Sequence, residues 1–283
     1  MSPFPVYGMD TGFYSRIGSY PPDVRCAMLA ELGYDATYLT LWSERAWADL
    51  DDVAASAARH RLTVAAVNVV ADAGAPVDAA GNARIIEMIG SVGATRTVEI
   101  AIRNDRAGLA RSDPAGDGDA LRFLAAAVDA AERNDVVLLL YPHTFYWLER
   151  VEDAVRLCDA FRHPRLRLLF PAFHWYAVDG TELPSTLRRA APYLAGVNLN
   201  GSRRISGQYF PATIEPLDSG DLDNFAILGA LRELDYAGMI GIQGYGVGGD
   251  AYEHFRRSIA ALRDIERRLD RHPDWAKLRS DHI

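Results

Sequence analysis

Eight short apolar runs, separated by amphipathic stretches, constrain the fold of this chain more than any other feature of its sequence. The runs are rich in leucine, β-branched and aromatic residues, and the stretches between them are long enough for helices of several turns. Such alternation predicts βαβ units and a parallel sheet. The predicted strands are residues 5–10, 36–42, 62–70, 96–103, 136–142, 166–173, 195–200 and 239–243.

The intervening stretches predict eight helices, some with recognisable N-caps. Asp250 followed three residues later by Glu253 forms a capping-box pattern, and Asp221 is a candidate N-cap. Eight strand and helix pairs favour a single (β/α)8 TIM barrel over a doubly wound open sheet, and no Pro/Gly/Ser-rich linker divides the chain. We therefore expect one domain over residues 1–283. The predicted helices are 21–33, 46–60, 80–93, 117–133, 149–161, 182–194, 221–235 and 250–270.

Charge and composition argue against several classes of partner. The net charge of −8 and the pI near 5.4 disfavour nucleic acid and anionic membrane surfaces, both of which attract a basic face. The two cysteines, Cys26 and Cys158, lie in helix-like stretches, so a reducing compartment fits better than a disulfide scaffold. The N-terminus lacks a signal-peptide pattern, and no apolar run is long enough to span a membrane. We expect a cytoplasmic protein.

Polar neutral and aromatic side chains follow the ends of the predicted strands, where TIM barrels hold their active sites. Aromatic faces ringed by amides and hydroxyls suit a sugar, whose C–H face packs on π-systems while its hydroxyls form hydrogen bonds. We favour a small carbohydrate ligand over an aromatic lid that packs only on itself. The candidate binding residues are Trp42, Asn68, Tyr141, Trp175, Asn198, Asn200 and Gln243, with Tyr245 in the loop that follows the last strand.

Three titratable residues are candidates for catalysis. His143 and His174 follow adjacent predicted strands, so either could face the cavity and transfer protons near neutral pH. Glu99 interrupts an apolar strand and would face the barrel interior together with Arg103. A buried carboxylate must be paired or have a raised pKa. We favour an ion pair of Glu99 with Arg103 over a general-base role.

Motifs for phosphate and metal binding are weak or missing. The glycines of GIQGYGVGGD, with Arg203 and Arg204 after the preceding strand, could bind an anion, although the Asp250 cap would compete for the same N–H groups. The sequence contains no zinc-ligand spacing, acidic calcium loop, P-loop, Gly-x-Ser-x-Gly elbow or Rossmann fingerprint.

Over nearly its whole length the chain resembles the xylose isomerase-like TIM barrel superfamily. The resemblance is strongest in LLLYPHTFYWLERVEDAVRLCDAFRHPRLRLLFPAFHW, in AGVNLNGSRR and in LDSGDLDNFAILGALRELDYAGMIGIQGYG. This superfamily includes sugar and sugar-phosphate isomerases and epimerases, and DNA-repair endonucleases of the AP endonuclease 2 type. It implies a divalent metal held by two Glu, an Asp and a His at the ends of strands five to eight.

The four positions of that metal site carry other residues here. They fall on Tyr141, Pro171, Asn200 and Gln243, none of which is a carboxylate or an imidazole. Hard dications prefer anionic oxygen or imidazole ligands, so we expect neither a bound metal nor another cofactor. The resemblance also implies a substrate-contacting histidine, which His174 matches, and an arginine matched by Arg203 or Arg204. The second catalytic glutamate that the resemblance implies corresponds to Trp147 or to a position near Glu149 in this sequence.

Two functions remain open from the sequence. The first is a sugar isomerase or epimerase-like enzyme that acts by proton transfer next to a carbonyl without a metal, with a lyase reaction as a variant. Its catalytic residues would be His143, His174 and Glu99, and Arg203 would join the binding residues. The alternative is a non-catalytic carbohydrate-binding pseudoenzyme. DNA repair is disfavoured by the acidic charge, and the sequence leaves a homo-oligomer open.

Overall fold

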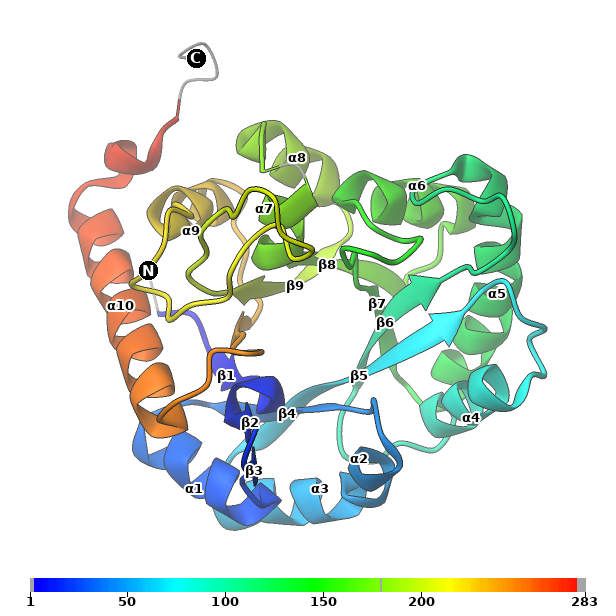
Figure 1. Cartoon of the computed structure of the whole chain (residues 1–283), viewed down its shortest axis with the longest axis horizontal. Helices are drawn as coiled ribbons and strands as arrows, with labels where there is room; N and C mark the ends of the chain where they lie inside the picture. The colour runs from blue at the N-terminus through cyan, green and yellow to red at the C-terminus, as the bar shows by residue number, and fades with distance from the viewer. Residues whose placement is uncertain (1–2, 179, 279–283) are drawn as a thin grey trace.

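The computed structural model describes residues 3–178 and 180–278. Within them, eight parallel strands close into one barrel in the order β1-β10-β9-β8-β7-β6-β5-β4, which confirms the predicted (β/α)8 fold (Figure 1). A separate two-stranded hairpin, β2 (Tyr14–Ser15) and β3 (Gly18–Ser19), follows β1. The barrel strands are β1 (Val6–Gly8), β4 (Ala36–Thr40), β5 (Thr63–Asp72), β6 (Thr97–Arg103), β7 (Val137–Leu140), β8 (Leu166–Pro171), β9 (Leu194–Leu199) and β10 (Ile240–Ile242).

Helices surround the strands as an outer ring (Figure 1). Three 3-10 helices, η1 (Asp10–Phe13), η2 (Pro114–Gly116) and η3 (Pro273–Ala276), lie in connecting or terminal segments. The α-helices are α1 (Pro22–Glu31), α2 (Glu44–Ala48), α3 (Leu50–Arg59), α4 (Ala80–Ile89), α5 (Asp117–Arg133), α6 (Val151–Phe161), α7 (Ala172–Val178), α8 (Leu183–Ala190), α9 (Asn224–Glu233) and α10 (Ala251–Arg271).

Several helix and strand boundaries differ from the sequence prediction. The helix expected over 46–60 is split into α2 and α3 at Asp49. The N-cap of α9 is Asp223, whose side chain accepts from the Ala226 N–H, so the prediction of Asp221 was wrong. The apolar run 166–173 ends as a strand at Pro171 and continues as α7, because proline cannot donate to a further ladder hydrogen bond. The Asp250 cap is confirmed by its bond from the Glu253 N–H.

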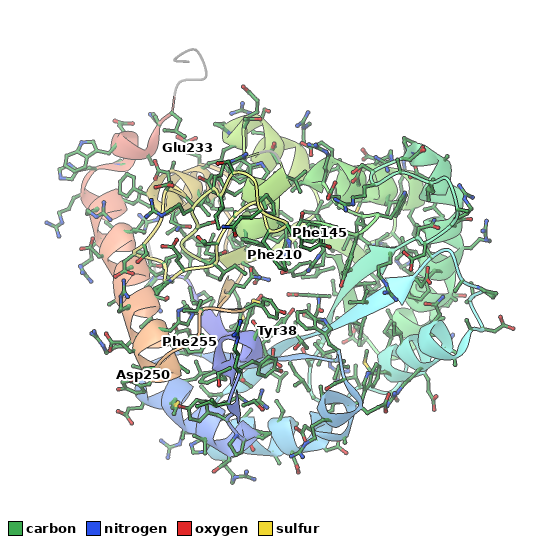
Figure 2. The ribbon with its side chains drawn as sticks, viewed as in Figure 1. Tyr38, Phe145, Phe210, Glu233, Asp250 and Phe255 are labelled. Atoms are coloured by element: carbon green, nitrogen blue, oxygen red, sulfur yellow. The ribbon has the colours of Figure 1, made fainter. Side chains whose placement is uncertain are left out.

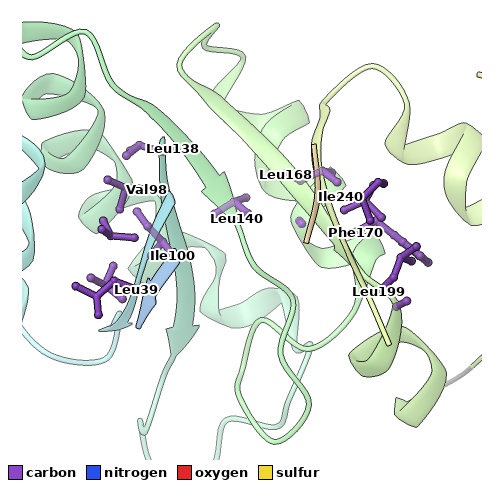
Figure 3. Packing of buried hydrophobic residues seen from close by; sticks show 14 of the residues in the cluster. Leu39, Val98, Ile100, Leu138, Leu140, Leu168, Phe170, Leu199 and Ile240 are labelled. Carbon is purple, nitrogen blue, oxygen red and sulfur yellow. The ribbon is translucent and has the colours of Figure 1, made fainter. Parts of the chain in front are cut away.

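Alternate residues of the strands face the helices and the barrel interior. Val98 and Ile100 on β6, and Leu138 and Leu140 on β7, belong to the main core outside the barrel (Figure 3). Phe170 on β8 belongs to the same core and is fully buried. This outer layer removes the largest apolar area from water and fixes which side chains point inward.

The barrel interior holds tyrosines and one carboxyl group in place of a purely aliphatic filling. Tyr7, Tyr38 and Tyr141 are buried there with Glu99. Room for the rings comes in part from Gly241 on β10, where a Cβ would lie 2.1 Å from Asn198 Oδ1 and 2.4 Å from the Tyr7 ring.

In the part of the chain that the structure describes, no helix is both long and apolar enough to cross a membrane.

Candidate active site

A cavity of about 450 Å³ opens at the C-terminal ends of the barrel strands. Apolar and aromatic surface dominates its wall, and polar groups lie at a few points. This composition is typical of small-molecule sites. The residues that line the cavity are Met9, Thr11, Tyr38, Thr40, Trp42, Asn68, Tyr141, His143, Thr144, Phe145, Tyr146, Phe173, His174, Phe210, Ala212, Ile214, Gln243, Tyr245 and Gly246.

Seven of the predicted site residues line this one cavity. Several of them contact one another: Trp42 donates from Nε1 to Asn68 Oδ1 over 3.0 Å. Trp42 also meets Tyr245 edge to face, with ring centroids 6.0 Å apart. The seven are Trp42, Asn68, Tyr141, His143, His174, Gln243 and Tyr245.

The other predicted residues lie outside the cavity wall. Trp175 is buried in the outer core against Phe170, with ring centroids 5.6 Å apart, because α7 turns it away from the barrel axis. Arg203 is half exposed and pairs with Asp221 at 2.8 Å. Glu99, Asn198 and Asn200 are buried and absent from the wall.

The two histidines lie next to each other in the wall. Their ring centroids are 4.0 Å apart, and His143 also stacks on Tyr146 at 4.2 Å. His143 belongs to the loop after β7, and His174 to the first turn of α7, so two adjacent strand ends bring them together. The sequence prediction placed both histidines near the cavity but did not predict that their rings contact each other or that His143 stacks on Tyr146.

Backbone hydrogen bonds assign opposite tautomers to the two rings. His143 Nδ1 lies 2.7 Å from the carbonyl oxygen of Thr144, so in the neutral ring Nδ1 carries the proton and Nε2 is an acceptor. His174 Nδ1 accepts from the Thr144 N–H over 3.2 Å, so its Nε2 carries the proton and is a donor. The pair thus offers one hydrogen-bond acceptor and one donor, held through a single residue, Thr144.

Burial keeps both rings neutral. It lowers the pKa of His143 from 6.5 to about 4, against the opposing hydrogen bond to Thr144. It also lowers the pKa of His174 well below 6.5, and the neighbouring His143 lowers it further. Neither ring should therefore change charge near pH 7.

Glu99 lies beneath the cavity and is held by phenols. Tyr38 donates to its Oε2, and the Tyr7 hydroxyl, whose shorter hydrogen bond goes to Asn198 Oδ1 over 2.5 Å, lies 3.3 Å from its Oε1. The predicted ion pair with Arg103 was wrong: Arg103 is the last residue of β6 and its side chain is exposed. Burial raises the pKa of Glu99 from 4.5 to about 7, and the hydrogen bonds from the two tyrosines oppose that rise.

This raised pKa predicts a pH-dependent stability. In the unfolded chain Glu99 loses its proton near pH 4.5, whereas the folded protein keeps it to about pH 7. Between these values the folded state binds more protons, so its stability falls as pH rises. A shift of this size corresponds to a loss of about 3 kcal/mol of unfolding free energy.

We expect Glu99→Gln, which cannot titrate, to remove this loss. Urea unfolding of both proteins between pH 4.5 and 8.5 measures it, since every other group titrates alike in the two. The unfolding free energy of Glu99→Gln minus that of the wild type should increase by about 3 kcal/mol as pH rises across this range. A difference that stays constant with pH would contradict the assignment.

Several buried polar atoms around the strand ends have no hydrogen-bond partner within the described residues. Thr11 Oγ1 and Gln243 Oε1 belong to residues of the cavity wall. Asn198 Nδ2 and Asn200 Oδ1 belong to fully buried residues of β9 and the position that follows it. Buried polar groups are normally hydrogen-bonded, so Thr11 Oγ1 and Gln243 Oε1 are available to bond a polar group in the cavity.

The glycine-rich segment after β10 contributes Gly246 to the wall but no cation. At the start of α10 the side chain of Asp250 already accepts the Glu253 N–H. Arg203 is ion-paired, and the Arg204 side chain lies over the Tyr176 ring and donates to the Tyr176 carbonyl. Among the wall residues there is no lysine or arginine for a phosphate to contact.

Sequence reasoning missed several wall residues, notably Tyr38 and Thr40. Both alternate with Trp42 along the predicted strand 36–42, and this period of two was the signal that could have found them. Phe210 and Ile214 come from the long segment after β9, for which no local pattern predicts the fold. Figure 2 shows Phe145 and Phe210 beside each other at the barrel mouth, with ring centroids 5.6 Å apart.

Comparison with known families agrees with this architecture. A family model described as xylose isomerase-like TIM barrel matches residues 26–265. The chain belongs to this family. The predicted resemblance is thereby confirmed.

Individual relatives are distant. A putative hydroxypyruvate isomerase of Danio rerio is 29% identical over 98 residues, which is 35% of this chain and only 32% of that protein. The 3-keto-D-glucoside 4-epimerase of E. coli has a TM-score of 0.71 at 16% identity, covering 92% of this chain and 99% of the other. An L-ribulose 3-epimerase has a TM-score of 0.75 at 15% identity, covering 98% and 99%. At such identities the structures show a common fold.

The family's metal-binding positions do not fit a dication in this member. Tyr141 lines the cavity, and burial, with the nearby Glu99, raises the pKa of its phenol, so it does not supply an anionic oxygen. Pro171 has no donor, and Asn200 and Gln243 carry neutral amides. No group of three or more His, Cys, Asp and Glu suited to a metal ion occurs in residues 3–178 and 180–278.

Proposed function

We propose that this protein is a sugar isomerase or epimerase-like enzyme that acts on an unphosphorylated keto-sugar or keto-glycoside without a metal. The observation that carries the proposal is the His143 and His174 pair, which presents a proton acceptor and a proton donor to one cavity. Isomerisation and epimerisation next to a carbonyl need both: a base for the C–H proton and a donor to the carbonyl oxygen.

The two rings have distinct roles. In isomerisation, Nε2 of His143 removes the proton from the carbon next to the carbonyl and returns it to the former carbonyl carbon, while the hydroxyl proton of the first carbon passes to the former carbonyl oxygen. In epimerisation, solvent water supplies a proton to the opposite face of the same carbon, and His143 releases its proton to solvent. Nε2–H of His174 donates a hydrogen bond to the carbonyl oxygen as its negative charge grows. A neutral imidazole suits this donor role, because it retains its proton near pH 7 and its strength does not depend on ionisation.

The wall chemistry supports an uncharged carbohydrate. Trp42 and Tyr245 offer aromatic surface for the C–H face of a sugar, while Asn68, Thr11 and Gln243 offer hydrogen-bonding groups for its hydroxyls. No lysine, arginine, aspartate or glutamate belongs to the wall. A phosphorylated sugar would bring a negatively charged group into a cavity whose wall has no cation to pair with it.

Solvent exchange of a substrate proton tests the proposal. The protein is incubated in deuterated buffer with L-ribulose, D-fructose or methyl 3-keto-β-D-glucopyranoside, and loss of the proton signal next to the carbonyl is followed by NMR. Enzyme-dependent exchange in at least one compound is expected. Binding of these compounds with no exchange would favour the alternative, a carbohydrate-binding pseudoenzyme, for which the absence of a carboxylate base in the wall is the supporting observation.

Metal independence gives a separate prediction. Because the four family positions hold a phenol, a proline and two amides, we expect Mn²⁺ or Mg²⁺ at 1 mM to leave the melting temperature unchanged relative to EDTA. Exchange activity should be the same in both buffers. Stoichiometric Mn²⁺, Mg²⁺ or Zn²⁺ in the purified protein, or loss of exchange in EDTA, would refute this part of the proposal.

A further inference from the structure

A tyrosine and a buried carboxyl group lie in contact at the floor of the cavity. Tyr38 lines the cavity and donates to Glu99 Oε2. Its ring is fixed by stacking on Tyr7, with centroids 5.4 Å apart and planes 11° apart. Tyr38 comes from β4 and Glu99 from β6, so the pair bridges the barrel interior across β5. Figure 2 shows Tyr38 within the ring of helices, toward the barrel centre.

No cation accounts for the burial of Glu99. Its titratable neighbours are Tyr7 from β1, Tyr38 from β4, Tyr141 after β7 and Tyr236 before β10, all phenols. None of the residues found to shift its pKa is basic. A carboxyl group at such a site costs stability that an apolar residue would not. Its presence beside a residue of the cavity wall suggests a chemical use.

We propose that Tyr38 and Glu99 form a neutral oxyanion site: Glu99, as the carboxylic acid, donates to the Tyr38 oxygen, and Tyr38 donates its own O–H to the substrate oxygen that becomes negative. The role deepens the proposed function and rests on it, since an enolate forms only if a C–H proton is removed. Preorganised donors in a water-poor interior are effective at stabilising such charge.

The proton count balances within the site. His143 takes the C–H proton, the carbonyl oxygen gains the negative charge, and the O–H groups of Tyr38 and Glu99 reorient without leaving their oxygens. Reprotonation of carbon by His143 restores the starting state. When Glu99 is ionised, Tyr38 must donate to it, as in the structure, and is no longer free to donate to the substrate. The raised pKa of Glu99 makes the acid form available near neutrality.

Binding of a stable enediolate tests the oxyanion site without turnover. Ascorbate is an ionised enediol of a sugar lactone, and L-gulono-1,4-lactone has the same carbon skeleton without the enediol. Calorimetric titration of both, in anaerobic buffer at pH 6 and 8.5, should show tighter binding of ascorbate at pH 6. That preference should fall about 10-fold or more at pH 8.5, because binding follows the fraction of protein with Glu99 protonated.

Two variants separate the members of the pair. Tyr38→Phe should lose the preference for ascorbate at both pH values. Glu99→Gln should keep the preference and lose its pH dependence, because the amide N–H donates to Tyr38 at every pH. Should Tyr38→Phe fail to fold, the pH dependence of Glu99→Gln decides alone. Tyr34→Phe is the matched control: its hydroxyl donates to the Phe255 carbonyl, it is outside the wall, and Arg263 rather than Glu99 influences its pKa, so wild-type behaviour is expected.

Equal affinity for the two lactones overturns the inference, as does a preference that rises with pH or no ascorbate binding at millimolar concentration. The result is independent of the exchange assay. Ascorbate preference without solvent exchange of any sugar would refute the proposed enzyme while leaving the oxyanion site intact. Solvent exchange of a sugar proton without a preference for ascorbate would support the proposed enzyme and refute the oxyanion site.

Discussion

His174→Ala is expected to slow solvent exchange of the substrate proton by about 10²- to 10⁴-fold, the usual range for loss of a general acid or base. The variant removes the Nε2–H that is proposed to donate to the carbonyl oxygen, so charge on that oxygen would lose one of its donors. The measurement is the initial rate of proton loss by NMR, for whichever keto-sugar the wild-type protein exchanges. Because burial keeps His174 neutral, its loss should lower the rate equally between pH 6 and 8.

Control variants distinguish this chemical effect from damage to the fold. His272→Ala removes a histidine that stacks on Trp275 beyond the end of α10, so its exchange rate should match the wild type. His174→Gln retains an N–H donor and should recover part of the lost rate. If His174→Ala exchanges as fast as His272→Ala, the assignment of His174 is incorrect.

Phe170→Ala is expected to lower the unfolding free energy by about 3 to 5 kcal/mol. Phe170 is fully buried on the outer face of β8, and it packs on Trp175 of α7. The truncation would leave a cavity between the strand and the helix that carries His174. Urea unfolding monitored by circular dichroism measures the loss.

Phe210→Ala provides the matched control for that experiment. Phe210 is 52% exposed at the cavity mouth, so the same truncation should cost less than about 1 kcal/mol. Its expected effect is instead on sugar binding, because it contributes to the wall. Similar losses for the two variants would show that Phe170 does not form part of a close-packed layer.

The proposed site would differ in kind from a metal-centred one. Imidazoles, phenols, amides and a carboxyl group of raised pKa surround the cavity floor, and neutral hydrogen bonds supply the polarity. Neutral donors stabilise an enolate less than a dication does, unless they are preorganised and shielded from water. The buried Tyr7 and Tyr38 rings, which stack on each other, meet both conditions.

Partners across the barrel could not be read from local sequence. Alternation placed Glu99 and Arg103 on one face, but Arg103 ends β6 and reaches solvent, whereas Tyr38 and Tyr7 come from positions 61 and 92 residues away. Such contacts depend on how eight strands close, which no window of sequence contains. Trp175 was misplaced for a related reason: a strand-like run became the first turns of α7, which changed the direction of its side chain.

The sequence alone determined that this chain forms a (β/α)8 barrel, because the periods of 2 and 3.6 in its apolar residues are local properties that select strand and helix. It also determined that a phenol, a proline and two amides occupy the four positions where the family resemblance implies metal ligands. Tertiary structure decided which of these groups meet, which tautomer each histidine adopts and how strongly burial shifts each pKa. Those properties depend on distance, hydrogen bonding and exclusion of water, which arise only when residues far apart in the chain are packed together.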